Sequence, residues 1–254
     1  MIWIDWRMAY WPALQTWFSG QDPYASPLFI NPPWLLPIIA PLGLLPPEWG
    51  AIGMNLLAVS GLIVLCFRLG KPWVALLVGL SFVFVYTLLD GNVEGLVLWG
   101  LAIAGPAGLL LLSVKPQVAG LVAIIWGIQA WQRSRWRGVL ILFGPTFLIA
   151  AVFTLIYPQW IAAALGARNQ PAATSVNLWP WLLPVAVGCL AYAVVKLRPA
   201  WAALATNLAV PYFRVHSYIG ALTLIAAENP WLGAVAVLGS WVYFFVAYVG
   251  VLRR

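Results

Sequence analysis

The sequence predicts an all-α protein, a polytopic bundle of helices that lies in a membrane. Hydrophobic residues make up 64% of the chain and charged residues 7%, whereas roughly a quarter of the residues in a soluble domain are charged. Several apolar stretches approach the roughly 20 residues that a spanning helix needs, among them residues 138–157 and 231–252. Neither stretch shows the two-residue alternation of a membrane β-strand. We therefore expect a single integral membrane domain over residues 1–254.

The first part of this domain, residues 1–48, is expected to lie against the outer face of the membrane. Prolines are frequent between residues 27 and 49, and each removes a backbone donor or ends a helical turn. We therefore predict juxtamembrane helices over residues 10–18 and 33–45, joined by the turn-rich residues 20–24.

The transmembrane helices are expected within residues 49–254, and their basic ends set the orientation. By the positive-inside rule, a helix over residues 49–67 ends in the cytoplasm at Arg68. Residues 72–89 return outward as one helix and end at Asp90, on the same side as the N-terminal segment.

The rest of the chain predicts shorter and broken helices. Gly-Pro and Lys-Pro pairs interrupt the apolar stretches, and irregular backbone within a membrane must be buried in protein or line a cavity. The expected segments are a short helix at 92–104, a broken cytoplasmic hairpin at 107–114 and 118–132, a helix at 138–157, an outer polar loop at 158–178, a helix at 179–195, one kinked crossing at 200–227 and a last helix at 231–252.

Composition argues against a nucleic-acid-binding protein and assigns no functional role to the cysteines. The net charge of +7 is expected to mark cytoplasmic loops, so no nucleic-acid partner is predicted. Cys66 and Cys189 both lie in apolar stretches, where they are expected to be small buried hydrophobic residues. The N-terminus lacks the uninterrupted apolar core of a signal peptide.

The charged residues within or beside the apolar stretches are the candidates for function, because charge in hydrocarbon costs several kcal/mol. A carboxylate can take a proton from an attacking hydroxyl, and cations can hold a phosphate, so the mixture suits a substrate with both groups. These candidates are Asp5, Asp22, Asp90, Glu94, Lys115, Arg168, Arg214 and His216.

Structural roles are the alternative for several of these residues. Asp22 precedes a proline and can cap a turn, the commoner role for that pair. Asp90 and Glu94 are four residues apart at an expected helix start, where acids are favoured by the helix dipole. His216 is the one histidine of the chain and can be a hydrogen-bonded packing residue.

Several short segments also occur in an order typical of one family of membrane enzymes. The segments are Asp5, Gly20-Gln21-Asp22-Pro23-Tyr24, Phe29-Ile30-Asn31-Pro32-Pro33, Asp90-Gly91-Asn92, Lys115-Pro116-Gln117, the basic loop from Arg133 to Arg137, and Pro211-Tyr212 followed by His216. By this order, over most of its length, the chain resembles glycosyltransferase family 87, the polyprenyl-phosphate-mannose-dependent membrane mannosyltransferases.

The resemblance implies a C-type glycosyltransferase fold and transfer of a sugar, mannose, from a polyprenyl-phosphate donor to a hydroxyl of a lipid or glycan acceptor at the outer membrane face. It implies that Asp5 is the catalytic base. No metal and no cofactor is expected, because protein cations can neutralise a leaving monophosphate. The implied substrate-binding residues are Asp22, Tyr24, Asp90, Asn92, Glu94, Lys115, Gln117, Arg168, Arg214 and His216.

Members of this family have a spanning helix before the catalytic loop, so by the resemblance the chain is shortened at its N-terminus. Three explanations stay open: a start further upstream, a partner membrane subunit that supplies the helix, or an inactive relative. The alternative function is a non-catalytic lipid-binding or scaffold subunit of a larger membrane complex. A lipid transporter ranks last, because the sequence shows no repeated halves. The expected location is the plasma (inner) membrane of a bacterium, among membrane lipids.

Overall fold

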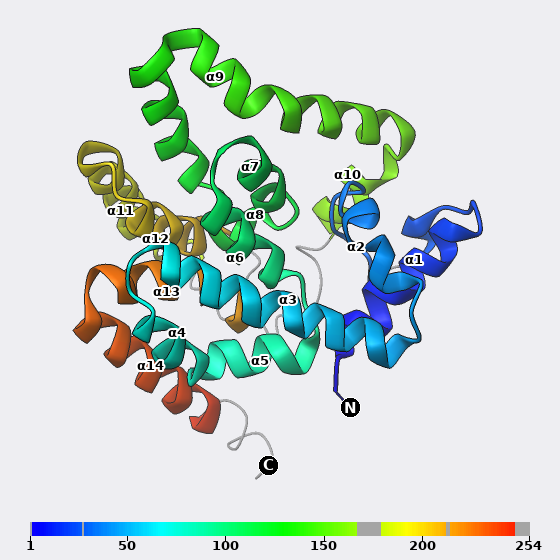
Figure 1. Ribbon diagram of the computed structural model, residues 1–254, viewed down its shortest axis with the longest axis horizontal. Coiled ribbons are helices and arrows are strands. Elements are labelled where there is room, and N and C mark those ends of the chain that lie inside the picture. The colour runs from blue at the N-terminus through cyan, green and yellow to red at the C-terminus, as the bar shows by residue number, and fades with distance from the viewer. Residues whose placement is uncertain (1, 27, 167–178, 212–213, 247–254) are drawn as a thin grey trace.

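The computed structural model describes residues 2–26, 28–166, 179–211 and 214–246, and every regular element in these ranges is a helix (Figure 1). The elements in chain order are η1 (Trp6–Tyr10), α1 (Trp11–Phe18), η2 (Pro23–Ala25), α2 (Leu35–Gly43), α3 (Pro47–Arg68), α4 (Trp73–Gly79), α5 (Phe82–Asp90), α6 (Glu94–Ile103), α7 (Gly105–Ser113), α8 (Pro116–Ala119), α9 (Val122–Ile156), α10 (Gln159–Gly166), α11 (Leu183–Lys196), α12 (Pro199–Ala209), η5 (Val215–Tyr218), α13 (Ile219–Glu228) and α14 (Pro230–Phe244). The all-helical prediction is therefore confirmed.

Among the described residues, two helices are long and apolar enough to cross a membrane, α3 and α9. The count rises to three if the bent pair of α4 and α5 is one broken span. Helix α3 confirms the helix predicted over residues 49–67. It begins at Pro47. Proline is favourable there because a backbone N–H in the first turn of a helix has no partner within the helix, so none is lost. Glu48 follows in the same turn, where the helix dipole favours an acid.

The N-terminal segment forms short helices, as the sequence predicts. Helices α1 and α2 pack against each other, and Leu14, Leu35 and Leu36 are fully buried between them and the rest of the core. The indole Nε1 of Trp6 donates to the carbonyl of Pro47 (2.8 Å), which holds η1 against the start of α3.

The prediction of one helix over residues 72–89 is wrong, because the chain bends by 71° between α4 and α5. Ser81 has extended backbone at the bend, and its hydroxyl accepts from the backbone N–H of Phe84 (3.1 Å) as the N-cap of α5. Its hydroxyl also donates to the carbonyl of Val78 (2.6 Å), so the serine satisfies backbone groups on both sides.

Helix α14 stabilises this bend from a distant part of the chain. The hydroxyl of Ser240 accepts from the N–H of Phe82 (3.1 Å), and the indole Nε1 of Trp241 donates to the carbonyl of Leu80 (2.8 Å). The break therefore depends on tertiary hydrogen bonds that satisfy exposed backbone groups.

The predicted break at Gly105-Pro106 is confirmed. Ala104 and Gly105 both have positive φ (54° and 65°), and the chain reverses there so that α6 and α7 pack against each other. The break predicted at the basic residues around Arg133 is also confirmed, because α9 consists of two helices that meet at a kink where Ser134 and Arg135 leave helical geometry.

Two further predictions are corrected. The outer loop expected at 158–178 begins with a helix, α10, and residues 167–178 lie outside the described ranges. The stretch 200–227 is not one kinked crossing, because α12 and α13 are separate helices that pack against each other, with η5 between them. The side of the membrane on which each segment lies stays a prediction.

Helices α3 and α6 cross closely enough that a glycine is required at the contact. A Cβ added to Gly95 would lie 2.6 Å from the backbone nitrogen of Ala58, and one added to Gly61 would lie 2.8 Å from the carbonyl oxygen of Gly95. Close backbone approach at small residues is typical of helix pairs in membranes.

Gly95→Ala is therefore expected to lower the free energy of unfolding by about 1–3 kcal/mol, because the backbone of α3 must move to admit a methyl group. The matched control is Gly188→Ala in α11, where an added Cβ meets nothing within 4 Å. That control is expected to leave stability unchanged or raise it by up to about 1 kcal/mol, since alanine favours helix. Unfolding with a denaturing detergent measures both, and equal effects would contradict the close crossing.

Candidate functional site

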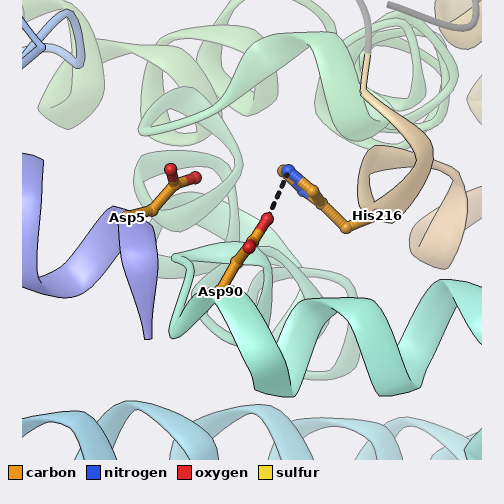
Figure 2. Close-up of side chains that lie close together, drawn as sticks. All are labelled: Asp5, Asp90 and His216. Carbon is orange, nitrogen blue, oxygen red and sulfur yellow. Dashed lines mark ion pairs between the residues drawn. The ribbon is translucent and has the colours of Figure 1, made fainter. Parts of the chain in front are cut away.

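Three parts of the chain that are far apart in sequence bring polar side chains to one place (Figure 2). Asp5 immediately precedes η1, Asp90 ends α5, and His216 lies in η5. Their side chains point toward a common space in Figure 2. With their neighbours they form what we call the polar cluster, whose members are Asp5, Asp90, Asn92, Glu94, Lys115, Arg214 and His216.

The turn between α5 and α6 supplies three members of the cluster. Gly91 caps α5 with a left-handed backbone (φ 62°), a conformation that glycine adopts without strain. A Cβ at this position would lie 3.1 Å from Cβ of Trp6 and 3.3 Å from Cβ of Trp3. The N–H of Trp3 also donates to the carbonyl of Leu89 (2.5 Å), so the N-terminal segment lies directly on this turn.

Asn92 connects the two sides of the cluster. Its Oδ1 accepts from the hydroxyl of Tyr10 (2.7 Å) and from Nζ of Lys115 (2.9 Å), and its Nδ2 donates to Oδ2 of Asp5. Burial, and after it the charge of Asp5, raises the pKa of Tyr10, so its hydroxyl stays protonated as the donor. The amide therefore positions Asp5 against the buried end of α6.

Glu94 is fully buried at the start of α6 and carries the strongest contacts. Its Oε1 lies 2.5 Å from Nζ of Lys115 and 2.5 Å from Nδ1 of His216, and Oγ of Ser217 is 3.4 Å away. Lys115 reaches this carboxylate from the connection between α7 and α8, where it is the N-cap residue of α8 and Pro116 is the first helical residue.

Asp90 and Glu94 each have one buried oxygen without a hydrogen-bond partner among the described residues, Oδ2 of Asp90 and Oε2 of Glu94. The side chain of Asp90 is 4% exposed, and its Oδ2 lies 3.6 Å from Nε2 of His216, whose ring packs against the ring of Tyr86 with centroids 5.6 Å apart. Asp5, Asp90 and His216 each offer one ligand atom, and these atoms lie within 4.8 Å of one another, so the three residues can hold a metal ion.

Four members of the polar cluster, Asp5, Lys115, Arg214 and His216, line a cavity of about 510 Å³. Asp5 and Arg214 are its partly exposed ion pair, with Nη1 of Arg214 3.3 Å from Oδ1 of Asp5. Gln117 also lines the cavity. The lining also includes apolar residues, among them Ile4, Met8, Leu28, Val114, Trp160, Ala164 and Val210.

Two predicted site residues lie outside both the polar cluster and the lining of this cavity. The carboxylate of Asp22 accepts from the N–H of Tyr24 (2.9 Å), so it caps η2, as the structural alternative expects. The hydroxyl of Tyr24 donates to the carbonyl of Asn31 (2.7 Å), and burial, followed by the charge of Asp22, raises its pKa. Neither is among the described residues that line the cavity. Arg168 lies outside the described residues.

Neutral hydrogen-bonding residues of the site were missed from the sequence. Tyr10 holds Asn92, Ser217 approaches Glu94, and Asn31 lines the cavity while its Nδ2 donates to the carbonyl of Val114 (3.1 Å). A search for charges in apolar sequence cannot find them. The sequence signal that could have identified Asn31 as a site residue is its position among prolines and apolar residues, in one of the segments that carry the family resemblance.

The fold and the site together define an all-helical protein with two to three helices that could span a membrane and a buried polar cluster beside a cavity. Comparisons of the chain with models of protein families, with curated proteins and with solved structures find no match.

Proposed function

We propose that this protein is a membrane glycosyltransferase that transfers a sugar, mannose by the resemblance, from a polyprenyl-phosphate donor to an acceptor hydroxyl at the outer membrane face. The observation that carries the proposal is the ion pair of Asp5 and Arg214 at a cavity whose lining includes both charged and apolar side chains. A lipid-linked sugar phosphate likewise combines a charged head with an apolar chain.

Asp5 is the best placed carboxylate for a general base. Its side chain is 19% exposed, whereas the side chains of Asp90 and Glu94 are 4% and 0% exposed. In the proposed reaction, Asp5 takes the proton of the acceptor hydroxyl while the hydroxyl oxygen attacks C1 of the sugar. The bond between C1 and the phosphate oxygen breaks, and the configuration at C1 inverts.

Cations at the cavity support the departure of the phosphate. The guanidinium of Arg214 is 28% exposed beside Asp5, and Lys115 lines the same cavity. Arginine binds phosphate oxygens through two parallel hydrogen bonds, so Arg214 is the proposed ligand of the polyprenyl phosphate as its charge grows. The apolar residues of the lining would contact the first units of the polyprenyl chain.

The membrane location is part of the proposal. Helices α3 and α9 support it by length and composition, and the apolar residues exposed on α9, such as Phe147 and Leu155, would face lipid. We place the protein as a multi-pass protein in the plasma membrane of a bacterium, with the cavity open to the outer face.

A non-catalytic lipid-binding subunit is the second candidate, and one observation favours it. Both oxygens of Asp5 already have partners, Asn92 on one and Arg214 on the other, so an acceptor hydroxyl would have to compete with them for the carboxylate. In that role the cavity binds a lipid phosphate without turnover, beside a catalytic partner subunit.

The deciding experiment measures transfer of radiolabelled mannose from a polyprenyl-phosphate donor to endogenous lipid or glycan by the purified protein in lipid nanodiscs. Arg214→Gln is expected to raise KM for the donor about tenfold to a hundredfold, because it removes a charge-assisted hydrogen bond to phosphate worth about 1.5–3 kcal/mol. Glu228→Gln, an exposed carboxylate at the end of α13, is the control and should change neither constant. If the wild type binds the donor but transfers no sugar, the proposal of an enzyme is wrong and the proposal of a lipid-binding subunit is supported instead.

A further inference from the structure

We infer that Asp5, Asp90 and His216 form a binding site for one divalent first-row transition metal ion, such as Zn²⁺ or Mn²⁺. Asp5 immediately precedes η1, Asp90 ends α5 and His216 lies in η5, and their ligand atoms lie within 4.8 Å of one another. Figure 2 shows the two carboxylates and the imidazole turned toward one space. This inference concerns the chain's own residues and does not rest on the proposed function.

The orientation of His216 prepares one ring nitrogen as a ligand. Nδ1 lies 2.5 Å from Oε1 of Glu94, so the proton is on Nδ1 and donates to that carboxylate. The lone pair is then on Nε2, which faces Asp90 and lies 3.5 Å from the amide nitrogen of Asn92, a donor. A carboxylate that holds the far nitrogen of a ligating histidine is the usual outer partner at metal sites.

The distance between His216 and Asp90 fits two ligands of one ion. Nε2 and Oδ2 are 3.6 Å apart, which is too long for a hydrogen bond. Two ligands that are each about 2.1 Å from a zinc ion lie roughly 3.4 Å apart at a tetrahedral angle. The observed pair is therefore close to the separation that a shared metal ion needs.

Asp90 supplies the second, independent observation. Its side chain is 4% exposed, and Oδ2 has no hydrogen-bond partner among the described residues, although it points into the group. A buried carboxylate oxygen without a donor is costly, and coordination to a cation removes that cost.

The charge of the polar cluster also favours a cation. Among its described members, the three carboxylates face one lysine and one arginine, which leaves one negative charge when the histidine is neutral. Two carboxylates and one imidazole form a donor set that suits Zn²⁺ and Mn²⁺. Asp5 and His216 line the cavity, whereas Asp90 is not among its lining residues, so the open positions of the ion would face the cavity.

Metal binding by the purified protein, without any donor substrate, tests the inference. The protein is prepared in nanodiscs with a histidine-free tag, stripped with a chelator, and titrated with Zn²⁺ by calorimetry and with Mn²⁺ by electron paramagnetic resonance. We expect one ion per chain, with Zn²⁺ and Mn²⁺ competing for the same site. No binding of either ion at millimolar concentration would overturn the inference.

Variants separate this site from binding elsewhere. Asp90→Asn and His216→Gln are each expected to weaken binding at least tenfold, and Glu94→Gln about tenfold to a hundredfold through the histidine. The control Glu228→Gln should bind as the wild type does. Asp90→Asn is expected to fold, because it removes a buried charge whose Oδ2 has no partner among the described residues. Unchanged affinity in this variant would mean a surface ion and would overturn the site.

A measurement on the wild type alone covers the case in which a variant fails to fold. Pulsed electron paramagnetic resonance of bound Mn²⁺ should show coupling to the nitrogen nucleus of one imidazole, and His216 is the only histidine of the chain. Absence of this coupling would exclude His216 as a ligand. Because no donor is present in these measurements, failure of the transfer assay leaves the result for metal binding untouched.

Discussion

Asp5→Asn is expected to lower kcat for sugar transfer by about 10²- to 10⁴-fold, the usual contribution of a general base. The amide keeps the size of the side chain and its position beside Asn92 and Arg214, but it cannot take a proton from the acceptor hydroxyl. KM for the donor is expected to stay within about threefold, because the proposed phosphate ligand, Arg214, is retained. Initial rates at saturating donor and acceptor give both constants.

The split between kcat and KM distinguishes a base from a structural residue. A merely structural Asp5 would lower thermal stability and both constants together, so the melting temperature is measured on the same preparation. Glu228→Gln is the matched control, since it makes the same change from carboxylate to amide at an exposed position. Undiminished kcat in Asp5→Asn would end the assignment of Asp5 as the base.

Glu94→Gln is expected to lower the free energy of unfolding by about 3–5 kcal/mol, the cost of removing one partner of a buried ion pair. The side chain of Lys115 is 8% exposed and lies 2.5 Å from Oε1 of Glu94, so the variant leaves an ammonium group buried without its countercharge. His216 loses the carboxylate at Nδ1 in the same step. Unfolding with a denaturing detergent measures the loss.

The exposed ion pair of Arg7 and Glu48 provides the comparison. Its nitrogen and oxygen are 3.0 Å apart, but the two side chains are 37% and 55% exposed, so Glu48→Gln is expected to cost less than about 1 kcal/mol. The double variant of Glu94→Gln with Lys115→Met should regain part of the stability, because it removes the unpaired charge as well. Equal losses for the two single Glu→Gln variants would contradict the burial of Glu94.

Charge in apolar sequence was a good guide to the members of the site but not to their contacts. Asp5, Lys115 and Arg214 were singled out because their charges lie in or beside apolar stretches, and the structure brings them to one cavity. Asp22 met the same criterion, yet its carboxylate caps a turn. The charge of a residue says that it needs a partner; whether that partner is a local backbone N–H or a distant side chain depends on the fold.

The break between α4 and α5 shows the same limit for secondary structure. Residues 72–89 are uncharged and mostly apolar and read as one helix, and Ser81 alone does not end a helix reliably. The backbone groups freed at the bend are satisfied by Ser240 and Trp241, which lie far away in sequence. No local pattern contains that information.

The sequence by itself determined that the chain is helical and apolar, where proline and glycine interrupt it, and which charged side chains need partners. Only the tertiary structure decided that Asp90 and His216 meet with Asp5, that Glu94 is held by Lys115, and that neutral Tyr10 positions Asn92. The physical reason is that hydrophobicity and backbone preferences act over a few residues, whereas a buried polar group is stabilised by whichever partners the packing of distant helices places within about 3 Å.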